Sequence, residues 1–190
     1  MLRRILLAVA LPPATIALLY AGYCGLLIWS GNVHTVKEGQ LYRSAELSEA
    51  GFAEEIETHH IRTVLNLRGA NPGKGWYRGE VSSTQAHGAK RFDIAISARS
   101  KVPEDKVAEI LAVLRDAPRP ILVHCASGSD RTGFVSALFL YAVLGETAEE
   151  AGRELSLWYG HFPFLGSRTH AMDDSLASYV VGHAPVMTAR

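Results

Sequence analysis

One stretch of the chain, HCASGSDRTG at positions 124–133, holds the residue types that phosphate chemistry needs. Cys125 supplies a sulfur nucleophile, and Arg131 supplies a planar fork of donors that matches phosphate oxygens. Gly128 permits a positive φ and a close approach of the backbone to an anion. A strand-like run precedes the stretch and a helix-like run follows it, so its N–H groups can turn toward an anion at the helix N-terminus. The stretch therefore predicts a phosphate-binding loop.

The same surroundings should ionise the thiol. A free cysteine has a pKa of about 8.5, and a helix N-terminus with a neighbouring arginine can lower this to roughly 3.5–7.5. Cys125 would then be a standing nucleophile at the bottom of a phosphate-shaped cup, which is the chemistry of a phosphate monoester hydrolase with a cysteinyl-phosphate intermediate. The alternative is an inert buried cysteine. The histidine, glycines and threonine of the same motif argue against a chance match.

The stretch resembles the signature HCxxGxxR[ST]G of the cysteine-dependent protein tyrosine phosphatase superfamily, in its compact dual-specificity branch. More loosely, over residues 39–181, LYRSAELS, TVLNLRG and PILVHC are similar to bacterial members. The resemblance implies no metal and no cofactor. It implies that Cys125 is the nucleophile, that Arg131 clamps the transition state, that Thr132 hydrogen-bonds the thiolate, and that His124 orients the loop and tunes the thiol. The implied phosphate cradle consists of Ala126, Ser127, Gly128, Ser129, Asp130 and Arg131.

The chain departs from the family pattern at the general acid. Most members carry an acidic residue on a separate loop before the cysteine, and here that loop reads ISARSKV. Asp93 is near in number but falls within the strand-like run RFDIAI, whereas Asp130 stands in the cradle, as in phosphatases with an Asp-Arg loop. We therefore assign proton donation to Asp130 over Asp93, although a neighbouring arginine favours the ionised form. Ala126 and Ser129 stand where phosphoinositide phosphatases often have lysines, which argues against a highly phosphorylated inositol substrate.

The rest of the sequence predicts the elements that position this loop. Strand patterns occupy residues 40–45, 62–67, 91–96 and 120–125. Helix patterns occupy residues 47–61 (with Ser48 as N-cap), 102–118, 132–145, 147–160 and 169–182, and a polar helix follows the loop that starts at residue 68. The alternation predicts an α/β fold with a mostly parallel central sheet flanked by helices on both faces. Ligands bind beyond the carboxyl ends of the strands in such sheets, where Cys125 lies.

The N-terminal run MLRRILLAVALPPATIALLYAGYCGLLIWSG predicts a membrane anchor. Its apolar part would span roughly 37 Å as a helix at about 1.5 Å per residue, which exceeds the ~30 Å hydrocarbon core. A cleaved signal peptide is the alternative, but the apolar run is long for one and lacks a small-x-small cleavage site. Arg3 and Arg4 place the N-terminus in the cytoplasm and the catalytic domain outside it. We expect residues 1–36 to be a single-pass anchor with a linker, and residues 37–190 to be the phosphatase domain.

Composition limits the partners. The chain has 190 residues, and 19 basic side chains balance 19 acidic ones, so no electrostatic argument supports a nucleic-acid partner. Cys24 and Cys125 are the only cysteines and suggest neither a disulfide scaffold nor a metal site. The expected function is that of a tyrosine or dual-specificity protein phosphatase. The alternatives are a lipid phosphatase, for example one acting on phosphatidylglycerophosphate, and an inactive phosphate-binding module.

Several other side chains have a functional interpretation and a structural alternative. Arg43 and Arg68 could rim the site, although surface salt bridges are a commoner role for arginine. The run from Trp76 to Arg78 could recognise substrate, or could anchor its loop to the core. The sequence WYGHFPF, residues 158–164, is a candidate contact patch for lipid or a partner, or a packing cluster at a helix end. Asp173 and Asp174 are interpreted as acids on a helix surface.

Overall fold

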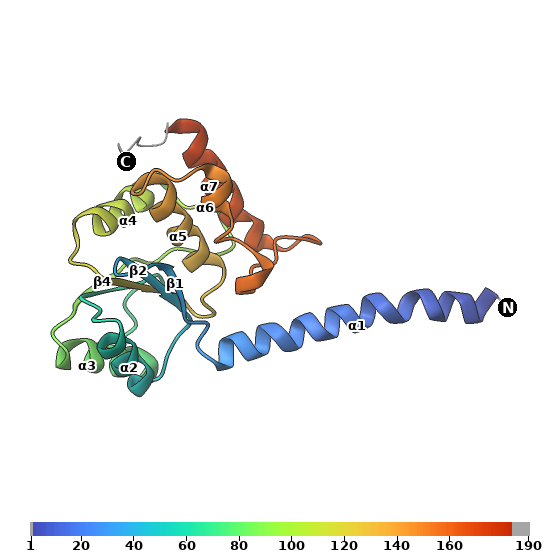
Figure 1. The fold of residues 1–190 in the computed structure, drawn as a ribbon, viewed down its shortest axis with the longest axis horizontal. Coiled ribbons are helices and arrows are strands. Elements are labelled where there is room, and N and C mark those ends of the chain that lie inside the picture. Colours follow the sequence, from blue (N-terminus) through green and yellow to red (C-terminus); the bar gives the residue numbers. More distant parts are fainter. Residues whose placement is uncertain (1, 184–190) are drawn as a thin grey trace.

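The structure, a computed structural model, describes the backbone of residues 2–183 and the side chains of residues 14–183. Within these residues the chain folds around a five-stranded sheet of order β1-β2-β5-β3-β4 (Figure 1). β1 pairs with β2 antiparallel, and the remaining neighbours are parallel. The strands are β1 (His34–Lys37), β2 (Leu41–Ser44), β3 (Thr63–Asn66), β4 (Lys90–Asp93) and β5 (Ile121–His124).

Helices cover both faces of the sheet (Figure 1). On one face lie α2 (Glu49–Thr58) and α3 (Gly75–Ala86). On the other lie α4 (Glu104–Asp116), α5 (Asp130–Ala142), α6 (Ala148–Gly152) and α7 (Ala171–Gly182). Short 3-10 turns, η1 (Leu157–Tyr159) and η2 (Arg168–His170), connect α6 to α7.

The sheet separates two apolar clusters, and the larger one contains α5. This helix is buried on nearly all sides, as its uniformly apolar sequence predicts. The smaller cluster joins α2 to the opposite face through Phe52 and Ile56. The expected N-cap of α2 is also present, because Ser48 Oγ accepts a hydrogen bond from the N–H of Gly51 at 3.1 Å. These clusters fix β5 at the centre of the sheet, with its carboxyl end at the surface where the loop begins.

The first strand was not anticipated from the sequence. β1 begins at His34, so the sheet starts inside the segment 1–36, to which we assigned only an anchor and a linker. Gly31, which precedes this strand, also contacts the domain. Its carbonyl accepts a hydrogen bond from the N–H of Ala45 at 2.7 Å. The side-chain amide of Asn32, which is buried, donates to the carbonyls of Ser127 and Tyr159.

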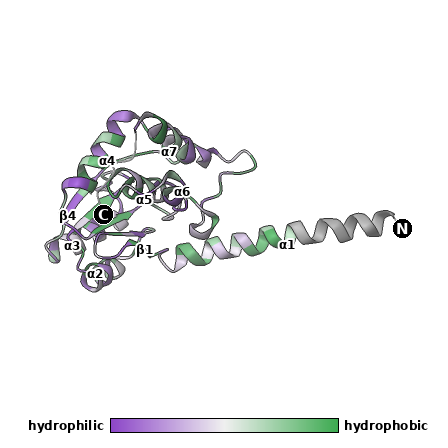
Figure 2. Ribbon diagram, turned by 45° about the horizontal axis from the view of Figure 1, so that its top comes forward, coloured by the Kyte–Doolittle hydropathy of each residue, from purple (hydrophilic) through white to green (hydrophobic). Residues whose placement is uncertain are grey.

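The prediction of a transmembrane helix is wrong. The N-terminal segment does form a helix, α1 (Leu2–Trp29), but among the described residues no helix has the length and apolarity needed to cross a membrane. Figure 2 shows the described part of α1 as a mixture of hydrophobic and paler turns. The tyrosines in this part serve the domain: the hydroxyl of Tyr20 donates to the Leu157 carbonyl at 3.3 Å, and that of Tyr23 to the Trp158 carbonyl at 2.6 Å.

The membrane localisation that we inferred from this helix is overturned with it. The orientation argument used Arg3 and Arg4, whose side chains lie outside the described residues. The aromatic run at residues 158–164 meets α1 instead, since Phe162 lies 5.8 Å from the ring of Tyr20 and Trp158 lies 6.4 Å from that of Tyr23. Part of the run is nevertheless exposed, with Trp158 at 65% and Phe164 at 54%.

Two shortened chains test where the folded unit begins. A chain starting at residue 31 keeps Asn32 and β1, whereas a chain starting at residue 38 loses both. We expect the shorter chain to be less stable by at least about 1–3 kcal/mol in urea denaturation, because Asn32 alone makes two backbone contacts and each such hydrogen bond contributes about 0.5–1.5 kcal/mol. In the longer chain, Asn32→Ala separates the contribution of the Asn32 side chain to stability from that of strand β1. Equal stability of the two chains would contradict the assignment of β1 to the folded unit.

Candidate active site

The phosphate-binding loop joins β5 to α5, and a glycine gives it its tight shape. Gly128 has φ of +71°, a conformation that other residues adopt at a cost. A Cβ atom there would lie 2.7 Å from the backbone nitrogen of Ala45 and 2.8 Å from the carbonyl oxygen of Ser44. The expected positive φ is therefore present, and the close backbone neighbour is the end of β2. Only glycine satisfies both requirements at this position.

The loop carbonyls point away from the cradle. The four consecutive carbonyl groups of residues 126–129 all accept hydrogen bonds from the N-terminal side of the chain. The N–H of Glu46 donates to the first at 3.2 Å, the amide of Asn32 to the second at 2.9 Å, and Arg43 Nη2 to the last two at 2.8 and 3.3 Å. Because the N–H and C=O of a trans peptide point in opposite directions, the N–H groups of this segment face the interior of the loop. This arrangement can hold an anion without any lysine.

The thiol of Cys125 lies at the base of this loop and is 1% exposed. Burial opposes ionisation, but the charge of Arg131, the Thr132 hydroxyl and the N–H groups of Thr132 and Ser127 outweigh it and lower the pKa of Cys125 below its usual value. Thr132 Oγ1 is buried and makes no hydrogen bond to the described residues, which leaves the hydroxyl free to turn toward the sulfur. The surroundings of Cys125 therefore favour its thiolate form.

Arg131 is placed beside the thiol by carbonyl groups at the strand ends. Its Nη1 donates to the carbonyls of Leu67 at 3.2 Å and Ile96 at 3.4 Å, which follow β3 and β4. Its Nε is buried and has no partner within the described part of the chain. A buried guanidinium N–H without an acceptor is costly, so a phosphate oxygen in the cradle would complete its hydrogen bonding.

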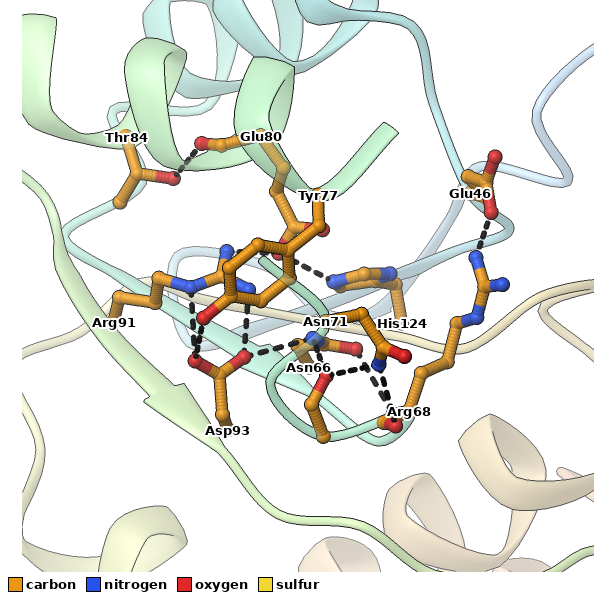
Figure 3. A network of polar contacts seen from close by, with 11 residues as sticks. Glu46, Asn66, Arg68, Asn71, Tyr77, Glu80, Thr84, Arg91, Asp93 and His124 are labelled. Carbon is orange, nitrogen blue, oxygen red and sulfur yellow. Dashed lines mark hydrogen bonds and ion pairs between the residues drawn. The ribbon is translucent and has the colours of Figure 1, made fainter. Parts of the chain in front are cut away.

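His124 is supported by a buried polar network behind the loop (Figure 3). Its Nε2 lies 2.9 Å from Glu80 Oε1, and the same carboxylate oxygen is ion-paired with Arg91. Its ring packs edge-on against Phe52 at 5.1 Å between centroids. The histidine is 0% exposed and precedes the nucleophile, so this network orients the start of the loop.

Asp93 belongs to the same network and is fully occupied (Figure 3). Its Oδ1 accepts from Asn66 at 2.8 Å and from Arg91 at 2.6 Å, and its Oδ2 accepts from Tyr77 at 2.8 Å and Arg91 at 3.2 Å. Burial opposes ionisation, but these donors together lower the pKa of Asp93. The carboxylate of Asp93 is thus held in its ionised form by four hydrogen bonds.

Asp130 has different surroundings. It is the first residue of α5, and one carboxylate oxygen, Oδ1, lies 2.7 Å from Nδ1 of His161. The side chain retains 19% of its exposure, and no other hydrogen bond to its carboxylate is found within residues 14–183. Of the two acids that the sequence offered, the structure thus leaves a free oxygen only on the one inside the cradle.

The proposed rim residues separate into one buried and several outer positions. Arg43 is 0% exposed and lies behind the loop, so it does not line the rim. Arg68 is ion-paired with Glu46 and its guanidinium carbon lies 3.7 Å from the ring of Trp76. Burial and the neighbouring charge of Arg131 lower the pKa of Arg68, which places this second cation near the cradle. Of the neighbouring residues, Tyr77 donates to Asp93, and the side chain of Arg78 donates to the carbonyl of Pro72.

The sequence did not indicate Asn32 or Glu80, and it suggested Arg43 only as a rim residue. These three residues act through tertiary contacts with the loop or with His124, and no local pattern marks that role. His161 was included in an aromatic packing run, and Asp173 was interpreted as a surface acid. Both sit in a chain of contacts that ends on Asp130. These contacts cannot be inferred from the sequence, because they form only when the fold brings η1, α5 and α7 together.

Comparison with known proteins agrees with this site. A buried cysteine and an arginine in a strand–loop–helix cradle are typical of cysteine-dependent phosphatases. Residues 28–151 match the tyrosine phosphatase family, and the chain belongs to that family. The resemblance that we described from the motif is thereby confirmed.

Individual relatives show how far the likeness extends. The chain is 32% identical over 118 residues to a rice protein, Inositol diphosphatase DSP1 of Oryza sativa subsp. japonica; the match covers 58% of this chain and 50% of that protein, so it spans half of the relative's length. Among solved structures, TpbA of P. aeruginosa has a TM-score of 0.59 at 24% identity, covering 81% of this chain and 86% of TpbA. The catalytic core of SIW14 from S. cerevisiae has a TM-score of 0.55 at 19% identity, covering 80% and 91%. Both structures share the fold.

The buried cation behind the loop gives a test of loop geometry. Arg43→Met leaves Glu154 without its partner, and we expect it to lower the free energy of unfolding by about 3–5 kcal/mol in urea denaturation. The double variant Arg43→Met/Glu154→Met removes both charges and should regain much of that stability. It should still bind inorganic phosphate more weakly than the wild type, because the carbonyls of residues 128 and 129 have lost their donor. Wild-type phosphate affinity in the double variant would show that Arg43 does not shape the loop.

Proposed function

We propose that this phosphatase cleaves phosphate monoesters of the phosphotyrosine or dual-specificity protein type through a cysteinyl-phosphate intermediate. The observation that carries the proposal is the position of Cys125, which is buried at the base of a loop whose carbonyls turn outward and whose N–H groups therefore face inward. Binding a phosphate needs the loop but does not need a thiolate. The second alternative, an inactive binding module, therefore gives no reason for a thiol at the base of the loop.

In the first half-reaction the thiolate of Cys125 attacks phosphorus. The S–P bond forms while the P–O bond to the leaving group breaks, and Asp130 gives its proton to the leaving oxygen. The loop N–H groups and Arg131 bind the non-bridging oxygens, where charge is carried in the transition state. The unpartnered Nε of Arg131 supports this role.

In the second half-reaction water replaces the sulfur. Asp130, now a carboxylate, takes a proton from water as the water oxygen attacks phosphorus and the P–S bond breaks. The electrons of that bond return to Cys125, which leaves as a thiolate. The Thr132 hydroxyl and the loop N–H groups that lower its pKa also make it a better leaving group.

The surroundings of the two acids support Asp130 over Asp93 as the proton donor. Asp93 lies at the end of β4, where four hydrogen bonds and the charge of Arg91 hold it ionised. Asp130 belongs to the loop itself and keeps a carboxylate oxygen that meets no protein donor among the described residues. A residue must be able to hold a proton before it can donate one.

The outer part of the site and the relatives support a substrate class. TpbA, which shares this fold, has been crystallised with phosphotyrosine. Arg68 and Trp76 form a cation–π pair near the cradle that can contact an aromatic substrate or its flanking acids. Arg68 also supports a second candidate, the inositol diphosphatase activity for which the rice relative is named. Ala126 and Ser129, which stand where phosphoinositide phosphatases often have lysines, argue against this candidate. The phospholipid alternative relied on the membrane anchor and has no remaining support.

A side-by-side assay tests the reaction and the substrate class. The wild type should release phosphate from a phosphotyrosine peptide, and Cys125→Ser should reduce turnover by several orders of magnitude while still binding inorganic phosphate, because the cradle is backbone and Arg131. An inositol diphosphate forms the second arm, and Arg68→Ala should reduce its turnover more than that of an activated aryl phosphate. Substantial turnover by Cys125→Ser would end the covalent mechanism. Preference for the inositol compound would move the substrate to the second candidate.

Leaving-group dependence tests the proton donor. Asp130→Asn should slow hydrolysis of phosphotyrosine by roughly 10²–10⁴-fold and hardly affect an activated aryl phosphate, whose leaving group departs without a proton. The basic limb of its pH–rate profile should flatten, while the acid limb, which reports Cys125, should persist. Asp93→Asn is the matched control, and it should lower stability without changing the leaving-group dependence. The reverse pattern would make Asp93 the donor and Asp130 a residue that shapes the loop.

A further inference from the structure

His161 lies completely buried between two acids from different helices. It follows η1, and its ring is 0% exposed. Its Nδ1 lies 2.7 Å from Oδ1 of Asp130 at the start of α5, and its Nε2 lies 2.9 Å from Oδ2 of Asp173 in α7. The side chain of Asp173 is 42% exposed, so the three residues connect the phosphate cradle to the surface of the domain.

The two acceptors require a charged ring. A neutral imidazole has one N–H and would turn a lone pair toward one of the carboxylates, whereas an imidazolium donates to both. Burial opposes the charge, but the hydrogen bonds to Asp130 and Asp173 outweigh it and raise the pKa of His161 to about 9. The ring is therefore a cation throughout the neutral range, with Asp173 as its outer partner.

The other titratable groups around this cluster come from α1. The phenol ring of Tyr20 lies 5.8 Å from that of Phe162, the residue after His161. Burial, Cys24 and Asp130 raise the pKa of Tyr20, so its hydroxyl stays neutral. Cys24 Sγ lies 3.8 Å from where a Cβ on Gly160 would stand, so α1 covers this side of the cluster. Within residues 14–183, the ionised partners that contact the His161 ring are thus Asp130 and Asp173.

We propose that His161 is a positioning residue for proton transfer, which holds Oδ1 of Asp130 and leaves Oδ2 to exchange the proton with the leaving oxygen. This inference rests on the role proposed above for Asp130. His161 keeps both of its protons through the cycle; the proton that moves is the one on Asp130, which passes to the leaving oxygen and is regained from water. Asp173 anchors the far side of the ring, so the ring cannot rotate away from the loop.

The charge of His161 also bears on the pH dependence of the reaction. A cation beside a carboxyl group favours its ionised form, so loss of this cation should move the basic limb of the pH–rate profile to higher pH. A purely structural histidine would lower activity toward all substrates alike and would leave that limb in place.

Matched variants separate these possibilities. His161→Asn keeps an amide donor near Oδ1 without the charge, and Asp173→Asn removes the outer anion at a partly exposed position. His170→Asn is the control, because His170 lies on the same connecting segment but pairs with Asp174 and does not contact the loop. Each protein is assayed across pH with phosphotyrosine and with an activated aryl phosphate.

We expect His161→Asn to slow phosphotyrosine hydrolysis by about 10–100-fold, part of the effect of losing the acid itself, and to slow the activated ester by less than about 3-fold. Its basic limb should move to higher pH, and His170→Asn should match the wild type. Equal losses with both substrates, or an unmoved basic limb, would overturn the proposal. Failure of the proposed function has a separate signature, since Cys125→Ser would stay active or Asp130→Asn would show no leaving-group effect.

Nuclear magnetic resonance of the imidazole nitrogens tests the same proposal without activity. In the wild type the His161 ring should stay doubly protonated until the pH approaches about 9. Asp173→Asn and Asp130→Asn each remove one anion and should bring its titration to lower pH, because fewer charges stabilise the cation. This measurement still applies if His161→Asn fails to fold. A ring that is neutral at pH 7 in the wild type would refute the positioning role.

Discussion

The active-site loop depends on one buried guanidinium. Arg43 lies in β2, wholly removed from solvent, and its Nη2 donates to the carbonyls of Gly128 and Ser129. Its charge is balanced by Glu154, 2.5 Å away, and its guanidinium carbon lies 3.8 Å from the ring centroid of Tyr159. A buried ion pair gives little net stability compared with well-packed apolar side chains. Its contribution here is geometric, because it turns the loop carbonyls outward and so leaves the N–H groups to meet the anion.

Strand order explains why this support comes from the N-terminal part of the chain. β2 pairs in parallel with β5, and Ser44 stands opposite His124 at the carboxyl ends of the two strands. The residues around the end of β2 therefore lie against the loop that continues from β5. Asn32, which lies just before β1, contacts the same loop, and β1 extends the sheet beyond β2. The phosphate-binding motif is contiguous, but the shape of its backbone is imposed by a segment about 80 residues earlier.

The same distinction decides what the sequence could predict. Cys125 and Arg131 were identifiable because their chemistry and their spacing occur in one stretch between a strand and a helix. Most strands and helices were also identifiable, since their apolar periodicity is local. The role of Arg43 was not, because an arginine in a strand carries no sign of which carbonyls it will meet. The N-terminal helix misled for the opposite reason: its apolar run indicated lipid, whereas Tyr20 and Tyr23 direct it toward the domain.

The proposed mechanism brings a thiolate, an acid and a phosphate dianion close together, and each of the two candidate acids, Asp93 and Asp130, contacts a basic side chain of its own. Arg91 forms an ion pair with Asp93 in the network behind His124, and both carboxylate oxygens of Asp93 accept hydrogen bonds there. His161 contacts only one carboxylate oxygen of Asp130, and its other ring nitrogen contacts Asp173. The first arrangement leaves neither carboxylate oxygen without a donor, whereas the second leaves one oxygen that meets no protein donor among the described residues. Two aspartates of the same intrinsic acidity can therefore serve structure and chemistry separately, according to how many of their lone pairs the protein occupies.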